Sequence, residues 1–406
     1  LTANNPAIGT DLYCLAPAGD PPILVTLGDQ GTILNSGSYY NSFTDSYRGI
    51  YFKGDNDPNF SGLFGLQAYQ NYFRTITGAL GANASTDLSD GPNAIEGEKC
   101  TSVNFDFQNN WIEDFDLGGI NLGNIKLAKV NVSSNIIFNN HLNTQFQFTC
   151  AIGVDAISAA GDPTVASITD NRIDNVRVGI FARNLERPYI HNNTGYLNPE
   201  LRFGLVTSVT VPFANGIRVE GCFGPQISDN VIRRAPLVPN NNATNVQCIH
   251  VESSDAAFVE SNTTYYSHYG LVFKDLSEGI NIVCNHFNAH IGAGVYFKDF
   301  GTFSQPIDIG TGYSVFPYIT ASENQWNNGG FNATWLRIKS DNTDGPVNWW
   351  WNGNSGTSYD YHPFLNAPSL FFYPIDNNGD CGLYAIHELP DGCEGQPEDC
   401  RERMIG

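Results

Sequence analysis

The chain has 406 residues, of which 41% are hydrophobic and 15% are charged, and its formal net charge is −21. Lys and Arg together number 20 against 41 Asp and Glu, so the basic surface that nucleic-acid binding requires is absent. No apolar run approaches the length of a membrane span, which argues against direct membrane insertion. The abundant glycine, 41 residues, favours short strands and turns over long helices.

Residues 1–46 contain turn-forming clusters such as NNPAIG and APAGDPP around one strand candidate, ILVTL. We interpret this segment as an N-terminal cap or entry coil, because a solenoid must protect its end edge from pairing with other chains. The start at Leu1 suggests a piece of a longer precursor. The coils themselves are expected over residues 47–339, beginning irregularly with GIYFKG.

The repeat is clearest in three units: GIRVEGCFGPQISDNVIRRA from Gly216, CIHVESSDAAFVESNTTYYSH from Cys248 and GLVFKDLSEGINIVCNHFNAH from Gly270. Each begins with a small residue and an alternating apolar run, and continues through a polar turn to a second apolar pair and an Asn. The repeat is too short for a pair of helices and suits one coil of three short strands. The sequence therefore predicts an all-β fold, a single right-handed parallel β-helix solenoid of about nine or ten coils.

The Asn that ends each unit has a structural interpretation. An amide offers both a donor and an acceptor, so equivalent Asn side chains can form a ladder along the stack. Asn also tolerates the left-handed backbone that such bends often require. The predicted ladder consists of Asn109, Asn135, Asn171, Asn192, Asn230, Asn262 and Asn285, and Asn324 stands in a ladder-like position.

Two sets of residues could hold calcium. DNNGD places Asp376, Asn378 and Asp380 at alternate positions, like the start of an oxygen-ligand loop, although the Glu expected at its twelfth position is replaced by His387. Asp170, Asp229 and Glu260 lie one or two places before a ladder Asn and could form an acidic cluster. SDN, ESN and TDN are also turn-forming sequences, and DNNGD is also compatible with a simple Asx turn, so we favour the structural interpretation of both sets.

Residues 340–406 lose the repeat and become rich in aromatic residues and proline, which indicates a C-terminal cap. Trp349, Trp350 and Trp351 could contact glycans, although at least one of them is expected to cover the last coil. Cys381 with Cys393 or Cys400 is the best candidate disulfide in this loop-rich end. Cys222, Cys248 and Cys284 fall inside coils, where we expect buried, small apolar side chains.

The coil units resemble right-handed parallel β-helix repeat proteins of the broad pectate-lyase-like group. They are most similar to long versions in secreted surface proteins of Bacteroidota. NIVCNHFNAHIGAGVYFKD, ITASENQWNN and the aromatic, Cys-containing end carry this resemblance, which covers about residues 95–395. By analogy it implies export by the type IX secretion system. The motifs specify the fold more closely than any activity, because many unrelated functions share this fold.

The leading functional expectation is a non-enzymatic, extracellular protein that serves as a rigid structural, adhesin or fibre component of a bacterial cell surface. Its expected partners are other copies, other surface proteins or glycans. The alternative is a polysaccharide lyase or glycoside hydrolase acting on an acidic polysaccharide, which would need carboxylates converging on one groove. We assign no catalytic residue from the sequence. Calcium is the one cofactor that the acidic motifs suggest.

Overall fold

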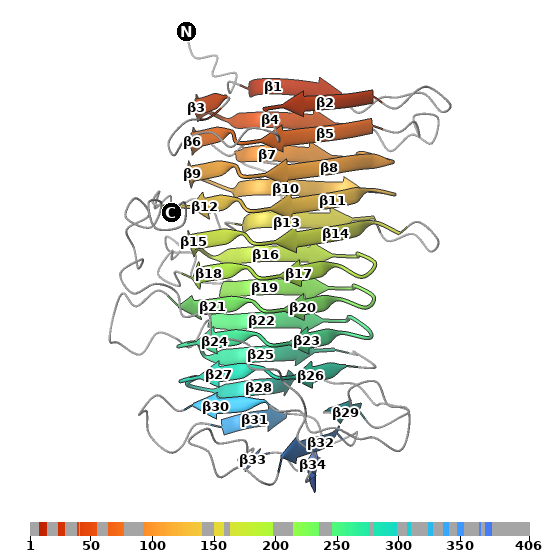
Figure 1. The fold of residues 1–406 in the computed structure, drawn as a ribbon, viewed down its shortest axis with the longest axis vertical. Coiled ribbons are helices and arrows are strands. Elements are labelled where there is room, and N and C mark those ends of the chain that lie inside the picture. Colours follow the sequence, from red (N-terminus) through yellow and green to blue (C-terminus); the bar gives the residue numbers. More distant parts are fainter. Residues whose placement is uncertain are drawn as a thin grey trace, which may run out of the picture. The chain divides into compact units, whose positions relative to one another are not determined.

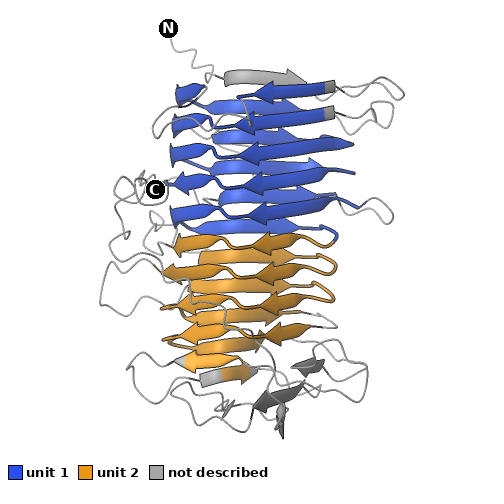
Figure 2. Cartoon of the chain, in the orientation of Figure 1, with its two compact units in different colours: residues 1–186, 200–210, 389–406 blue, residues 187–199, 211–388 orange. Residues whose placement is uncertain are grey.

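The structure is a computed structural model of the chain. It describes residues 8–13, 23–28, 39, 41–54, 64–76, 92–139, 150–157, 163–197, 214–234, 246–275, 280–298, 307–309, 324–327, 336–340, 347–352, 365–366 and 370–375. The described residues form β-strands and turns (Figure 1). They divide into two compact units, one built mainly from Leu1–Glu186 and the other mainly from Arg187–Pro199 and Val211–Glu388 (Figure 2).

Unit 1 contains three parallel sheets, and each coil of the chain contributes one strand to each of them in turn. Its first sheet contains β1 (Ile8–Tyr13), β4 (Arg48–Lys53), β7 (Asn93–Glu98), β10 (Gly118–Ile125), β13 (Cys150–Ala156) and β16 (Val178–Arg183). Its second contains β2 (Ile23–Leu27), β5 (Phe64–Tyr69), β8 (Val103–Gln108), β11 (Lys129–Ser133) and β14 (Val165–Thr169). Its third contains β3 (Ser42–Ser46), β6 (Tyr72–Ile76), β9 (Trp111–Phe115), β12 (Ile136–Phe138) and β15 (Arg172–Val176).

Unit 2 repeats this arrangement. Its first sheet contains β19 (Ala214–Glu220), β22 (Val246–Glu252), β25 (Tyr269–Lys274), β28 (Ala293–Lys298), β31 (Leu336–Ser340) and β33 (Leu365–Asn366). Its second contains β17 (Tyr189–His191), β20 (Gln226–Ser228), β23 (Phe258–Glu260) and β26 (Asn281–Val283). Its third contains β18 (Thr194–Leu197), β21 (Val231–Arg234), β24 (Thr263–Tyr265), β27 (His286–Asn288) and β30 (Gln325–Asn327). A separate sheet contains β29 (Ile307–Ile309), β32 (Val347–Asn352) and β34 (Leu370–Ile375).

The predicted fold class, an all-β parallel β-helix solenoid, is confirmed. The apolar residue that opens each coil lies beside its equivalent in the next coil, so that rows of aliphatic side chains fill the interior. In unit 2 this row is Ile217, Ile249, Leu271, Val295 and Ile338. In unit 1 it is Ile50, Ile95, Ile120, Ile152 and Ile180. Each member therefore buries its neighbours, which is how a solenoid builds one continuous core.

The ends of the predicted domains are not tested by the structure. β1, β2 and β3 lie inside the segment 1–46 that we expect to be a cap, and they pair in parallel with β4, β5 and β6. The predicted boundaries of 1–46, 47–339 and 340–406 stay predictions.

The small residue that opens many coils is explained by close approach of the next coil. A Cβ added to Gly216 would lie 2.6 Å from the carbonyl oxygen of Cys248 and 2.3 Å from Cγ2 of Ile232. The same addition at Gly49 would lie 2.5 Å from the carbonyl oxygen of Ala94. Only Gly, Ala or Cys therefore stands at this position in the described coils from Gly49 to Gly294.

The sheets differ in how many of their faces are buried. Along β11 and β14 of the second sheet, buried residues alternate with exposed or half-buried ones, so one face meets solvent. Along β7 and β13 of the first sheet every residue is buried. Outward-facing side chains of the first sheet, such as Phe181 and Tyr296, therefore lie in a buried environment although they point away from the solenoid core.

Candidate functional site

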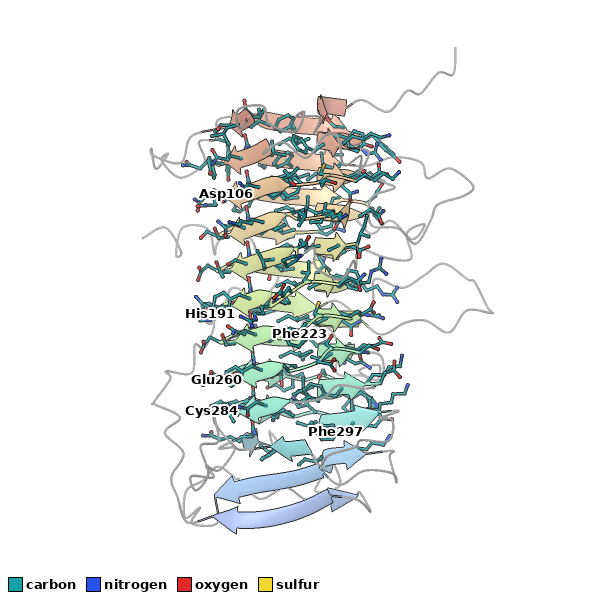
Figure 3. The ribbon with its side chains drawn as sticks, turned by 90° about the vertical axis from the view of Figure 1, so that its right-hand side faces the viewer. Asp106, His191, Phe223, Glu260, Cys284 and Phe297 are labelled. Atoms are coloured by element: carbon teal, nitrogen blue, oxygen red, sulfur yellow. The ribbon has the colours of Figure 1, made fainter. Side chains whose placement is uncertain are left out.

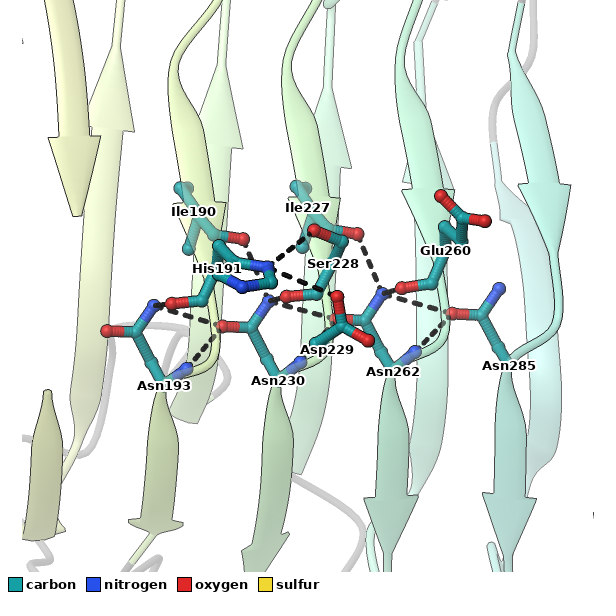
Figure 4. Close-up of polar contacts among 10 residues, drawn as sticks. All are labelled: Ile190, His191, Asn193, Ile227, Ser228, Asp229, Asn230, Glu260, Asn262 and Asn285. Atoms are coloured by element: carbon teal, nitrogen blue, oxygen red, sulfur yellow. Dashed lines mark hydrogen bonds and ion pairs between the residues drawn. The ribbon is translucent and has the colours of Figure 1, made fainter. Parts of the chain in front are cut away.

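A column of amide side chains marks the corner between the second and third sheets of unit 2 (Figure 4). Nδ2 of Asn193, Asn230, Asn262 and Asn285 each donates to Oδ1 of the next column member, Asn324 being the last, at 2.9–3.0 Å. The backbone N–H of each donor residue is bonded to the same oxygen at 2.9–3.1 Å. The second hydrogen on Nδ2 reaches a backbone carbonyl of the preceding coil, as from Asn230 to Ile190 at 3.0 Å.

Unit 1 has a column of the same kind. Asn41, Asn71, Asn110 and Asn135 each donate from Nδ2 to Oδ1 of the next member, and Asn171 accepts the last of these bonds. Asn71, Asn110, Asn135 and Asn171 are at most 1% exposed. A buried amide that is left unpaired is costly, whereas here both lone pairs and both hydrogens of an interior member are used. The columns therefore hold adjacent coils in register.

The structure corrects two predicted ladder positions. Asn135, Asn171, Asn230, Asn262, Asn285 and Asn324 lie in the columns. At the two Asn-Asn pairs, however, the column residue is the second one, Asn110 or Asn193, while Asn109 and Asn192 are exposed.

Wherever the residue before a column Asn is described, that residue has the left-handed conformation, and the column Asn itself does not, contrary to the expectation from the sequence. φ is 56° at both Asn109 and Asp229, 52° at Asn192 and 59° at Cys284. This residue turns the chain at the corner, and the following amide is buried. The two corrected positions follow directly, because the first Asn of each pair makes the turn.

The three acidic residues near the columns, Asp170, Asp229 and Glu260, occupy different structural positions. Asp170 and Asp229 both occupy the left-handed position, in unit 1 and unit 2 respectively. Glu260 lies in β23 on the outer face, and burial together with the nearby Asp229 raises the pKa of its carboxyl. Asp229 and Ser228 both contact Nδ1 of His191, at 3.1 Å and 3.0 Å (Figure 4). Because both partners use the same nitrogen, this group lacks the serine–histidine–aspartate order that a nucleophile requires.

A buried polar cluster lies on the outer side of the first sheet in unit 1. Glu96 is 0% exposed, and its Oε2 accepts from Nε of Arg48 at 2.7 Å and from Nδ2 of Asn93 at 2.9 Å. Asn93 in turn accepts from Asn121 at 2.6 Å. The other oxygen of Glu96, Oε1, and Oδ1 of Asn121 are both buried without a hydrogen-bond partner. Glu96 and Asn121 occupy paired positions on β7 and β10.

The pKa values of the two carboxyls of β7, Glu96 and Glu98, are shifted in opposite directions. Burial raises the pKa of Glu96 to about 8, although Arg48 and Asn93 act in the other direction. Burial also acts to raise the pKa of Glu98, but hydrogen bonds with Lys99 and Tyr51 outweigh it and the net direction is downward. The hydroxyl of Tyr51 donates to Glu98 at 2.9 Å. Neighbouring carboxyls that differ in this way can divide acid and base roles between them.

In unit 2 the outer side of the first sheet carries an ion-pair network. Arg218 contacts Glu220 and lies 3.3 Å from Glu252, which also contacts Lys274. His250 is buried and its Nε2 lies 3.3 Å from Glu252. The nearby imidazole of His250 and the ammonium of Lys274 lower the pKa of Glu252, while burial lowers the pKa of His250. Lys274 also lies 3.5 Å from Asp275, so each cation of the network lies between two carboxylates.

Several predicted residues lie outside the part of the chain that can be assessed. Asp376, Asn378 and Asp380 are outside the described residues, as are Cys381, Cys393 and Cys400. The backbone of Trp349, Trp350 and Trp351 runs in β32, but their side chains are not described. The calcium loop, the terminal disulfide and the tryptophan glycan contact therefore stay predictions.

The cysteines inside the coils do not all behave alike. Cys222 and Cys248 are 3% and 0% exposed, which suits small apolar side chains in the solenoid. Cys284 differs from the expectation, because it is only half-buried and stands at a left-handed turn position.

Among the residues that the structure describes, no group of three or more His, Cys, Asp or Glu side chains is arranged to hold a metal ion. In the same residues, no helix has the length and apolar character that crossing a membrane requires. Comparison with protein-family models, curated proteins and solved structures found no match.

Proposed function

We propose that this chain is a non-enzymatic, extracellular β-helix protein that acts as a structural, adhesin or fibre component of a bacterial cell surface. The observation that carries the proposal is the pair of amide columns. They use the conspicuous buried Asn side chains for inter-coil bonding, so the chemistry-bearing residues at this corner serve to stiffen each unit. A stiff stack with one solvated sheet face suits display of a contact surface.

The cellular setting of the proposal comes from the sequence resemblance. We place the chain with the secreted surface proteins of Bacteroidota, in the broad pectate-lyase-like group, with export by the type IX system. Its partners would be further copies of the chain, other surface proteins or glycans. Nucleic acid is not among them, because the formal charge of −21 would repel its phosphates.

The test of this proposal has two arms. Protease treatment of intact cells should remove the protein if it stands on the outer surface, and cells that lack it should adhere less well to glycan-coated supports. The purified protein should release no product from acidic polysaccharides, with or without a calcium chelator. Calcium-dependent unsaturated products would contradict the proposal, and so would protection of the protein from external protease.

One observation favours a second candidate, a carbohydrate-active enzyme. Glu96 and Glu98 stand on the same side of β7, with the pKa of one raised and that of the other lowered, as a glycoside hydrolase requires of its acid and its base. Both are nearly buried, so a substrate would reach them only after the site opened. Loss of any measured hydrolysis in both Glu96→Gln and Glu98→Gln would support this candidate, and hydrolysis retained by both would exclude this pair.

A further inference from the structure

The outer face of the second sheet in unit 2 presents aromatic side chains at regular positions. Tyr189 pairs with Gln226, and Gln226 pairs with Phe258, so the two aromatic residues stand on the same side of β17 and β23 with one coil between them. Their inward neighbours Ile190 and Val259 are 0% exposed, which fixes the direction of the alternation. Tyr189 is 37% exposed, and Phe258 is partly exposed.

A third aromatic residue, Phe223, lies in the intervening coil, three positions before Gln226 and beside Asp255 of the next coil. Phe223 is 53% exposed and lies in the turn just before β20. Its carbonyl accepts a hydrogen bond from the backbone N–H of Arg187, two residues before Tyr189. In Figure 3, Phe223 lies where β20 begins, and His191 and Glu260 lie toward the other ends of their strands. Aromatic rings therefore occur at the first residue of β17 and of β23 and in the turn just before β20.

His191 widens this surface and is held in place. Its ring stacks against Tyr189, with centroids 5.2 Å apart and ring planes 14° apart. Nδ1 of His191 is fixed by Ser228 at 3.0 Å and Asp229 at 3.1 Å (Figure 4). The stacking and the contacts to His191 restrain the ring of Tyr189, and a pre-oriented aromatic ring binds with little loss of side-chain freedom.

The spacing of the rings indicates the kind of ligand. Equivalent positions one coil apart in a parallel sheet are roughly 4.8 Å apart, so Tyr189 and Phe258 stand roughly 9.6 Å apart along the stack. That separation is close to the length of two sugar residues in an extended β-linked chain. The apolar face of a pyranose ring packs on aromatic rings, while polar side chains such as Gln226 and Ser228 can orient its hydroxyls.

The charge of the face selects among glycans. The charged side chains on the described part of this surface include Asp229 and Glu260, with Arg187 beside Phe223, and burial together with repulsion from Asp229 raises the pKa of Glu260. An anionic polysaccharide would add further repulsion beside these carboxyls, and the formal charge of −21 acts in the same direction. A neutral chain avoids this cost, and its hydroxyls can donate to the carboxylates.

We propose that the outer face of β17, β20 and β23 binds an extended neutral polysaccharide, whose sugar rings stack on Tyr189, Phe223 and Phe258. This inference rests on the proposed function, since it names the glycan that the displayed surface would contact. The proposed site differs from that of the alternative enzyme. It binds a neutral and not an acidic polysaccharide, it lies on the second sheet of unit 2 and not at Glu96 and Glu98, and it requires no reaction.

Isothermal titration of the full chain with soluble hexasaccharides tests the proposal. The probes are β-1,4-linked hexamers of glucose, mannose and xylose, with hexagalacturonate as the anionic comparison. We expect at least one neutral hexamer to bind, the corresponding disaccharide to bind much more weakly, and hexagalacturonate not to bind. Failure of all three neutral hexamers to bind, or equal binding of hexagalacturonate, would overturn the proposal.

Variants locate the binding. Tyr189→Ala and Phe258→Ala should each weaken binding about tenfold or more, because each removes a stacking ring. Tyr266→Ala is the matched control, since Tyr266 is 48% exposed and lies just after β24 in the third sheet. Unchanged binding in both ring variants, with folding confirmed by thermal melts, would overturn the proposal. If the full chain binds no neutral hexamer but cells that carry it still adhere, only this inference is contradicted. If the protein on intact cells is protected from external protease, the proposed function is contradicted.

Discussion

Nδ2 of Asn230 donates to Oδ1 of Asn262 at 2.9 Å, and the backbone N–H of Asn230 donates to the same oxygen at 3.1 Å. One side-chain oxygen therefore satisfies two donors of the preceding coil, while the amide nitrogen of Asn262 bonds to the carbonyl of Ile227 at 2.8 Å. The side chain of Asn262 therefore bonds to the preceding coil on both sides of that coil's turn, at Ile227 and at Asn230. Removing it should destabilise the contact between the two coils.

The first prediction concerns this side chain. Asn262→Ala should lower the free energy of unfolding by about 2–4 kcal/mol, because it leaves two buried donors and one carbonyl without partners. Urea denaturation measures the change. Asn104→Ala is the control, since Asn104 is exposed on β8, and it should change stability by no more than about 0.5 kcal/mol. Equal effects of the two substitutions would contradict the structural role of the column.

The second prediction concerns the left-handed turn position. Ser261 has a φ of 55° and precedes Asn262. Ser261→Val should destabilise the protein by about 1–3 kcal/mol, because a β-branched residue is strained there, whereas Ser261→Gly should be close to neutral. Ser167→Val, on the outer face of β14 in extended backbone, is the control and should be tolerated. Thermal melts measure the stability of the three variants. If Ser261→Val is as stable as the natural chain, the left-handed conformation at Ser261 is contradicted.

These corners show how far the sequence predicts the fold. The apolar row and the Asn that ends each coil can be read from the sequence, because a parallel stack repeats the same chemistry at each level. The exact column member cannot be read where two Asn residues adjoin, as at Asn109 and Asn110, since the residue type is the same. The discriminating signal is position: the column Asn directly precedes the next strand, as Asn110 precedes β9.

The candidate sites were less accessible to sequence reasoning. The row of Tyr189 and Phe258 depends on which coils are adjacent and on the lengths of the turns between them, which vary along the chain. The burial of Glu96 was also unforeseen, because an alternating strand normally leaves one face in solvent and the first sheet buries both. Tertiary context decides both features.

The third prediction is a pH dependence centred on Glu96. Burial raises the pKa of this carboxyl to about 8 from its ordinary value of 4.5, so between these values the folded chain holds a proton that the unfolded chain has lost. Stability should therefore fall as pH rises from about 4.5 to about 8 and level off above that. A protonated Glu96 could also donate from Oε1 toward the unpartnered Oδ1 of Asn121.

Glu96→Gln isolates this contribution. The amide cannot ionise, so the variant should gain stability relative to the natural chain as pH rises through this window, by up to several kcal/mol. Unfolding by urea at about pH 5 and about pH 8 gives the difference, in which all other titrating groups cancel. A difference that does not change with pH would show that Glu96 ionises normally in the folded chain.

The fourth prediction concerns His290, which is 2% exposed. Its Nε2 and Nδ1 contact Thr264 at 2.9 Å and Ser267 at 2.8 Å, and burial lowers its pKa to about 3. Below the unfolded value of 6.5 the unfolded chain gains a proton that the folded chain does not, so stability should fall as pH drops toward about 3. His290→Gln should make this acid destabilisation shallower, and an unchanged slope would contradict the buried neutral imidazole.

The stacking of successive coils is tested most directly by engineered disulfides in unit 1. Ser133 pairs with Thr169 on the adjacent coil, and Gln108 pairs with Ser133 on the coil before it. Adjacent positions are roughly 4.8 Å apart, within the range for a disulfide, whereas Gln108 and Thr169 are roughly 9.6 Å apart. Peptide mapping of oxidised double-cysteine variants should find the Ser133→Cys/Thr169→Cys cross-link in high yield and none for Gln108→Cys/Thr169→Cys. A cross-link in the second pair but not in the first would contradict the parallel, in-register stack.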